Sequence, residues 1–96
     1  MKTFKDLVFK KPFSGLINGA FEFPNGFMVS VAAGSLVYCT PREDLDSEKD
    51  YSSFEVAVYN KEGQFVTKEL TQSDSDVSGW CSREDINNIM ELAAKQ

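Results

Sequence analysis

Length, composition and charge restrict the function of this chain before any motif is considered. Its 96 residues are 42% hydrophobic and 26% charged, values typical of one globular domain with a single core. The formal net charge is −5, with a net +2 over residues 1–40 and a net −7 over residues 41–96. Nucleic-acid binding needs clustered Lys and Arg, so this acidic balance argues against it. Histidine, the usual general base and metal ligand, is absent, so we expect a binding protein without a cofactor rather than an enzyme.

Membrane insertion and secretion are not expected either. The sequence contains no apolar run near the roughly 20 residues that span a bilayer. Residues 1–6 show no apolar segment followed by a small-residue cleavage site, so we predict a cytoplasmic protein. Cys39 and Cys81 are too few and too far apart for a disulfide framework or a zinc motif. We predict that both are small buried side chains, and a single disulfide remains open if two strand ends meet.

The first half of the chain reads as a series of strands. Residues 4–9 are expected to form a first strand or an extended arm, which Pro12 and Gly15 end. Residues 17–23 and the alternating residues after Gly26 flank a Pro-Asn-Gly turn, a strong hairpin signal. A bend at Ala32-Ala33-Gly34 then leads into a further predicted strand, residues 36–39.

The second half alternates polar loops with strand patterns. Residues 41–52 are mostly polar and non-periodic, which predicts an exposed acidic loop. Residues 53–59 alternate again and predict a strand that places Phe54, Val56 and Val58 inward. Residues 60–63 supply a turn, residues 65–70 are expected to form the last strand, and residues 71–78 form a second acidic, Ser-rich loop.

The C-terminal segment predicts an amphipathic helix over about residues 83–95. Ser82 is the expected N-cap, with Asp85 three residues later as a weak form of the capping box. An apolar stripe follows at i, i+3, i+4 and i+7, namely Ile86, Ile89, Met90 and Ala93. The sequence therefore predicts an α+β fold in one domain, residues 1–96. An antiparallel sheet of about five strands, over about residues 3–70, would pack against one C-terminal helix.

The first candidate site is the acidic loop, whose carboxylates are Glu43, Asp44, Asp46, Glu48 and Asp50. Its spacing superficially resembles a calcium loop, but it lacks the central Gly and the terminal bidentate Glu of an EF-hand. The interpretations that we favour are a solvated loop and, next to it, an electrostatic surface for a basic partner.

The second candidate is Trp80, which is bracketed by Asp74 and Asp76 on one side and by Glu84 and Asp85 on the other. Carboxylates around an exposed aromatic side chain would make a protein-recognition patch, because Trp is enriched at binding hot spots. The alternative, which we favour slightly, is that Trp80 packs over the start of the helix as part of the core while Asp76 caps a turn.

Lysines alternate with aromatic residues near the N-terminus, a pattern that could contact nucleic acid. Given the net charge of −5, we interpret Lys2, Lys5, Lys10 and Lys11 as the solvent edge of a strand, where Lys also opposes edge-to-edge aggregation.

Several of these motifs occur together in one known group. Phe23-Pro24-Asn25-Gly26-Phe27 is followed by Val29-Ser30-Val31, Phe54-Glu55-Val56-Ala57-Val58, Gly63 and Asp76-Val77-x-Gly79-Trp80-x-Ser82. In this order and spacing the chain resembles a group of small tailed-bacteriophage and prophage proteins, which read F-P-N-G-Y-x-x-S-V, then Y-E-L-A-V, D-G and D-V-x-G-Y. Two segments depart from that pattern. The acidic insertion at residues 41–50 replaces a short Gly-rich link, and residues 66–71 replace the usual Y-D-T-P-I-T.

The resemblance implies a phage protein that acts in the host cytoplasm. Our leading hypothesis is a non-enzymatic, anti-CRISPR-like or other anti-defence protein, which inhibits a host enzyme or bacterial defence complex by direct binding. Its acidic loops and Trp80 would contact a basic surface of the partner, as a monomer or homodimer. The alternative is a virion or assembly accessory protein that acts through self-association. A small hydrolase with paired carboxylates is the third hypothesis.

Overall fold

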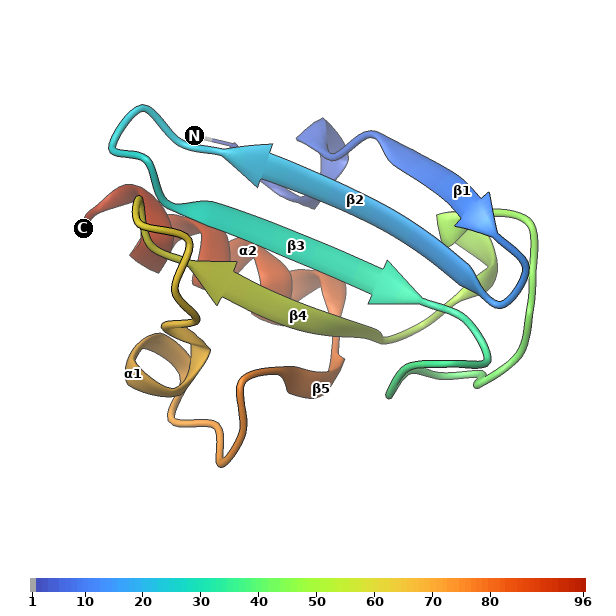
Figure 1. The fold of residues 1–96 in the computed structure, drawn as a ribbon. Coiled ribbons are helices and arrows are strands. Elements are labelled where there is room, and N and C mark those ends of the chain that lie inside the picture. Colours follow the sequence, from blue (N-terminus) through green and yellow to red (C-terminus); the bar gives the residue numbers. More distant parts are fainter. Residues whose placement is uncertain (1) are drawn as a thin grey trace.

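The structure, a computed structural model that describes residues 2–96, is a single antiparallel sheet with one long helix against one face (Figure 1). Five strands within these residues lie in the order β1-β2-β3-β4-β5, so each strand pairs with its neighbour in sequence. This arrangement confirms the predicted α+β class. The elements in chain order are η1 (Phe4–Asp6, a 3-10 helix), β1 (Phe9–Phe13), β2 (Leu16–Glu22), β3 (Met28–Ala33), η2 (Glu48–Asp50, a 3-10 helix), β4 (Phe54–Tyr59), α1 (Thr67–Thr71), β5 (Ser78–Cys81) and α2 (Arg83–Ala94).

The predicted hairpin between β2 and β3 is confirmed. Phe21 pairs with Val29 in an unbroken register, and the turn is closed by hydrogen bonds from Phe23 N–H to the Phe27 carbonyl (2.7 Å) and from Gly26 N–H to the Phe23 carbonyl (2.9 Å). Gly26 has a φ of 89°, and a Cβ there would come within 2.5 Å of the Lys61 side chain. Glycine is therefore required at this turn for its conformation and for space.

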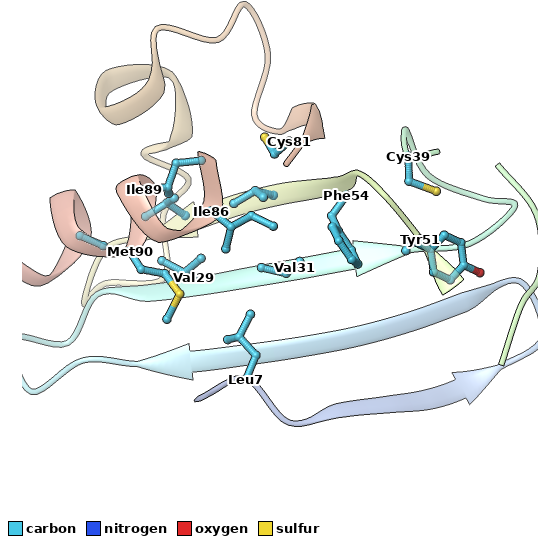
Figure 2. Packing of buried hydrophobic residues seen from close by; sticks show 14 of the residues in the cluster. Leu7, Val29, Val31, Cys39, Tyr51, Phe54, Cys81, Ile86, Ile89 and Met90 are labelled. Carbon is cyan, nitrogen blue, oxygen red and sulfur yellow. The ribbon is translucent and has the colours of Figure 1, made fainter. Parts of the chain in front are cut away.

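The core lies between the sheet and α2 (Figure 2). Ser82 caps the helix as predicted, because its hydroxyl accepts from Asp85 N–H while the Asp85 carboxylate accepts from Ser82 N–H. The predicted helical stripe is buried against the predicted inward face of the sheet. These facing sets are Ile86, Ile89, Met90 and Ala93 on α2, and Val29, Val31, Phe54, Val56 and Val58 on β3 and β4.

Asn25, at the centre of the hairpin turn, also caps the C-terminus of α2. Its side-chain amide donates to the carbonyl oxygens of Ala93 (2.9 Å) and Gln96 (3.0 Å), while its Oδ1 accepts from Phe27 N–H (2.9 Å). The last carbonyls of a helix have no partner within the helix, so a side-chain donor there stabilises its end. The turn and the helix, far apart in sequence, are joined by this one residue.

Asn25→Ala is expected to lower the free energy of unfolding by about 1–2 kcal/mol, because it removes both the cap and the turn hydrogen bond. Asn25→Asp keeps the side-chain oxygen that accepts from Phe27 N–H and loses the amide that donates to the helix carbonyls. Its effect therefore measures the contribution of the helix cap alone. It should destabilise the protein to a similar degree, since it also places a negative charge at a helix C-terminus. Urea unfolding followed by circular dichroism measures the stability of both variants. An unfolding midpoint of Asn25→Asp equal to that of wild type would contradict the claim that Asn25 stabilises the end of α2.

The prediction of a strand or extended arm over residues 4–9 is wrong for the start of this range. Residues 4–6 form η1, in which Thr3 and Asp6 make a capping box, and this turn places the Phe4 ring 5.0 Å from the Phe54 ring. The strand begins only at Phe9 and runs through Pro12. Proline is tolerated there because β1 is the edge of the sheet and its missing N–H leaves no ladder bond unmade.

The predicted strand at residues 36–39 is also wrong. After β3 the chain bends at Gly34, whose φ is 141° and where a Cβ would lie 2.0 Å from the Gly15 carbonyl oxygen. Tyr38 N–H then bonds to the Glu55 carboxylate (2.9 Å) instead of a strand partner. Ladder pairing resumes only as a single bridge between Thr40 and Ser53.

Residues 65–70, the predicted last strand, mostly form α1 instead. Phe65 makes one bridge to Tyr59, after which the chain leaves the sheet. The buried Thr67 hydroxyl takes the place of a strand partner by accepting from Val58 N–H at 2.8 Å. This edge of the sheet is therefore β5, which lies beyond the predicted limit at residue 70 and shares only Ser78 with the predicted 71–78 loop.

Candidate protein-interaction surface

Trp80 lies in the short edge strand β5 at a break in the ladder. Cys81 pairs with Phe54 and Ser78 pairs with Val56, so Gly79 and Trp80 together stand opposite one residue of β4. Two residues opposite one is the arrangement of a β-bulge, which redirects side chains. Trp80 is 62% exposed. The core interpretation of Trp80 is therefore wrong, because the bulge turns the side chain out of the core.

The Trp80 backbone is unusual as well. Its φ is 52°, in the left-handed region that costs an L-residue about 1–2 kcal/mol. The other non-glycine residue with a positive φ, among those the structure describes, is Gln72, which ends α1 in the usual left-handed C-cap. Trp80 has no such role, and a bulky side chain in this conformation is an outlier. Such strain is typical of positions whose side chain is needed where it stands.

Tyr38 holds the Trp80 side chain in place. Its ring centroid lies 5.2 Å from that of Trp80, and its carbonyl accepts from Trp80 N–H at 3.0 Å. A Cβ at Gly79 would come within 2.8 Å of the Tyr38 Cβ, so glycine permits this close approach. The Arg42 guanidinium covers Tyr38 at 5.1 Å from the ring centroid. The result is a supported aromatic pair on the surface, Tyr38 itself being 45% exposed.

A groove opens beside Trp80, between α1, β5 and α2. We call it the β5 groove, and its volume is about 330 Å³. Its apolar walls are Leu70 of α1, Trp80 of β5, and Ile89 and Leu92 of α2, and its polar groups include Asp85 and Asn88. Leu92 is 41% exposed although it stands on the long helix. Cys81 also lines the groove, and burial raises the pKa of its thiol.

The predicted acidic loop is held to the opposite edge of the sheet. Lys11 of β1 contacts Asp44 at 2.6 Å, and its Nζ lies 3.9 Å from the fully exposed Asp46. Tyr51 fixes the loop from inside, because its hydroxyl donates to the Glu43 carbonyl (2.6 Å) and accepts from Leu45 N–H (2.8 Å). The loop is thus an ordered part of the fold.

The remaining carboxylates of this loop serve its local structure. Asp50 accepts from Ser47 N–H at 3.2 Å and completes the capping box of η2. The Glu48 carboxylate accepts from the Ser47 hydroxyl at 3.4 Å. Of the five predicted residues, Glu43 and Asp46 are the exposed ones whose carboxylates have no strong contact within the described residues.

The Lys11–Asp44 contact should make the loop sensitive to pH. The hydrogen bond from Lys11 lowers the pKa of Asp44 below its ordinary value, and the same bond raises the pKa of Lys11. Because folding lowers the pKa of Asp44, the Lys11–Asp44 contact stabilises the protein fully above about pH 4. This stabilisation is lost as the pH falls through the folded-state pKa of Asp44. Amide NMR shifts of Leu45 should report this transition. Asp44→Asn should abolish it, and an identical titration in that variant would contradict the assignment.

Asp74 and Asp76 are exposed in the loop that leads into β5. The hydroxyls of Ser73 and Ser75 close this loop by donating to the Val77 carbonyl at 2.7 and 2.8 Å. Ser75 rather than Asp76 accepts from Val77 N–H, so the expected capping role of Asp76 is wrong. Both carboxylates remain available to a partner on the Trp80 side of the molecule.

The structure therefore separates the eight predicted site residues into two groups. Asp74, Asp76 and Trp80 belong to the edge formed by β5, while the acidic loop belongs to the edge formed by β1. Sequence reasoning missed Tyr38, Arg42 and Leu92. The pairing of Tyr38 with Trp80 joins residues far apart in the chain and leaves no local signal, whereas Leu92 was visible as an apolar residue outside the buried stripe.

Other kinds of site would involve the cysteines, the carboxylates or the helices. Both cysteines are buried and free, as predicted. Within residues 2–96 no cluster of three or more His, Cys, Asp or Glu side chains is arranged to hold a metal ion. In the same residues, no helix has the length and apolar character needed to cross a membrane. Comparison with protein-family models, curated proteins and solved structures found no match.

Proposed function

We propose that this chain is a phage-encoded, non-catalytic interaction protein that inhibits a host enzyme or a bacterial defence complex, in the host cytoplasm, by direct binding. The phage context is supported by the motifs shared with the tailed-phage group. The binding role is supported by one observation above others: Trp80 is 62% exposed on a strained backbone and is stacked on Tyr38.

In this proposal, the Trp80 side chain is preorganised for binding. An exposed Trp in a protein of this size buries more surface in a complex than almost any other side chain, which is why Trp is enriched at hot spots. The Tyr38 ring and the bulge restrict its motion before binding, so less conformational entropy is lost on association. In this proposal, the backbone strain at Trp80 is the free energy needed to hold its side chain in an exposed position.

The acidic loop at the opposite edge has a secondary role in the proposal. Glu43 and Asp46 would steer a basic partner towards the protein through long-range attraction. Changing both to the neutral amides should slow association and reduce its salt dependence while leaving the dissociation rate close to wild type. Surface plasmon resonance at two ionic strengths measures both rates. An unchanged association rate would remove the loop from the binding mechanism.

The proposed function is tested by capture from a bacterial lysate with immobilised wild-type protein and two variants. Trp80→Gly removes the exposed ring. Phe65→Ala is the matched control, because Phe65 is also a 45% exposed aromatic residue stacked on a tyrosine, Tyr59, but lies at the other end of β4. A partner retained by wild type and by Phe65→Ala, and lost with Trp80→Gly, is expected. The enzymatic activity of that partner should fall on stoichiometric addition of wild-type protein. Equal capture by all three proteins would contradict the proposal.

Self-association is the alternative function. Multi-angle light scattering over a range of concentrations distinguishes the two. A monomer at high concentration would remove the assembly-protein alternative, whereas stable oligomers that Trp80→Gly dissociates would favour it.

A further inference from the structure

The elements that form the β5 groove carry an excess of negative charge, and one carboxylate, that of Asp85, lines the groove itself. Six of the chain's fifteen acidic residues and three of its ten basic residues lie between positions 67 and 95, the segment that supplies α1, β5 and α2. This segment therefore carries −3 of the net charge of −5, and the rest of the chain, with nine acidic and seven basic residues, carries −2. The six acidic residues are Glu69, Asp74, Asp76, Glu84, Asp85 and Glu91.

Of the three basic residues of this segment, Lys95 pairs with Glu91 at 3.2 Å, and none of Lys68, Arg83 and Lys95 lines the β5 groove. Arg83 points to the other side of α2, where its guanidinium lies over the rings of Phe4 (4.9 Å) and Phe54 (5.1 Å). It donates to the carbonyl oxygens of Tyr51 and Glu48, both at 2.9 Å. Its charge is therefore committed to the junction between η1, η2 and the start of α2.

Apolar walls and a carboxylate occur at the same place. Leu70, Ile89 and Leu92 line the β5 groove, whose volume of about 330 Å³ is at the lower end of the range for ligand pockets and holds one or two side chains. Asp85 lines the same groove, and Trp80 forms one wall with most of its ring open to solvent. Trp is the aromatic side chain that attracts cations most strongly.

From these observations, and resting on the proposed interaction function, we infer that the β5 groove binds a polypeptide segment of the partner in which an apolar side chain is flanked by Lys or Arg. The apolar side chain enters between Leu70, Ile89 and Leu92. The flanking cation lies over the Trp80 ring, on the side of the groove that Asp85 lines. Arg42 over Tyr38 already shows this kind of contact on the neighbouring ring.

The test selects short random peptides on the immobilised full chain and, in parallel, on the Leu92→Ser variant. Leu92 is 41% exposed, so this variant should fold normally, which circular dichroism checks. Peptides enriched on wild type alone are expected to carry Lys or Arg beside Leu, Ile or Phe. The chain contains one Trp, so the emission of Trp80 reports directly on the groove when a selected peptide is titrated. Affinity should fall at least tenfold with Leu92→Ser and should weaken with added salt.

Three outcomes would overturn the inference: no enrichment on wild type, equal enrichment on Leu92→Ser, or enrichment of peptides without Lys and Arg. A wild-type dimer that Leu92→Ser converts to a monomer would also overturn it, because the groove would then bind a second copy. Failure here is distinguishable from failure of the proposed function. A lysate partner that depends on Trp80, combined with a negative peptide selection, leaves the interaction role intact and rejects only the basic apolar segment.

Discussion

Trp80→Gly is expected to weaken partner binding at least about 30-fold while changing the free energy of unfolding by no more than about 1 kcal/mol. Glycine adopts a φ of 52° without the cost of about 1–2 kcal/mol that tryptophan bears there. This relief of strain stabilises the folded variant. It offsets two losses, namely the stacking on Tyr38, worth about 0.5–1.5 kcal/mol, and the greater conformational entropy that glycine gives to the unfolded chain. Loss of a hot-spot Trp should cost at least 2 kcal/mol of binding, about a 30-fold change in Kd.

Two measurements on the same variant separate these effects. Urea unfolding followed by circular dichroism gives the stability, and capture of the lysate partner gives the binding. A structural role for Trp80 predicts the reverse pattern, namely a loss of more than about 3 kcal/mol of stability with binding retained in the folded fraction. That pattern would contradict the functional interpretation of the strained backbone.

Phe54→Ala is expected to have the largest effect on stability, a loss of about 3–5 kcal/mol in the free energy of unfolding. Phe54 is fully buried, and its ring lies 5.0 Å from Phe4, 6.1 Å from Phe9 and 6.2 Å from Tyr51. Arg83 also lies over it at 5.1 Å. The substitution therefore opens a cavity where η1, β1, the loop before β4 and α2 all meet.

For a domain of this size, such a loss removes a large part of the total stability. The matched control is Phe65→Ala, which removes the same ring from a 45% exposed site and should cost less than about 1.5 kcal/mol. Urea midpoints compare the two variants, and near-equal midpoints would contradict the central position of Phe54.

The elements that were predicted from the sequence are those with strong local signals. The Pro24-Asn25-Gly26 turn needs only its own residues and the alternation on either side, and α2 is specified by its Ser82 cap and its buried stripe. Strand β4 follows in the same way from the alternation of residues 54–59. In each case the local preference and the tertiary packing agree.

The elements that were missed depend on contacts between distant residues. Residues 36–39 have a strand-like composition, but Tyr38 is engaged by Glu55 and Trp80, which no local pattern reveals. Thr67 bonds to Val58 in place of a strand neighbour, so the segment after Phe65 turns into a helix. The exposure of Trp80 likewise depends on a bulge opposite β4, and the alternation of so short a strand does not show it.

The structure also changes where we expect the binding surface. The acidic loop was the first candidate because five carboxylates lie close together in its sequence. Asp44, Glu48 and Asp50 are engaged in contacts that hold the loop itself. The groove beside Trp80 combines an exposed aromatic ring, apolar walls and the Asp85 carboxylate, so we assign the principal role to it.

The most direct test of this account is the emission of Trp80, the one tryptophan of the chain, in the complex with the lysate partner. Replacing the tryptophans of the partner with a non-fluorescent analogue leaves Trp80 as the source of the signal. On binding, its emission should shift to shorter wavelength and its quenching by acrylamide should fall several-fold, because the ring leaves water. Unchanged emission and unchanged quenching in a fully formed complex would show that the partner binds elsewhere and would contradict the central claim.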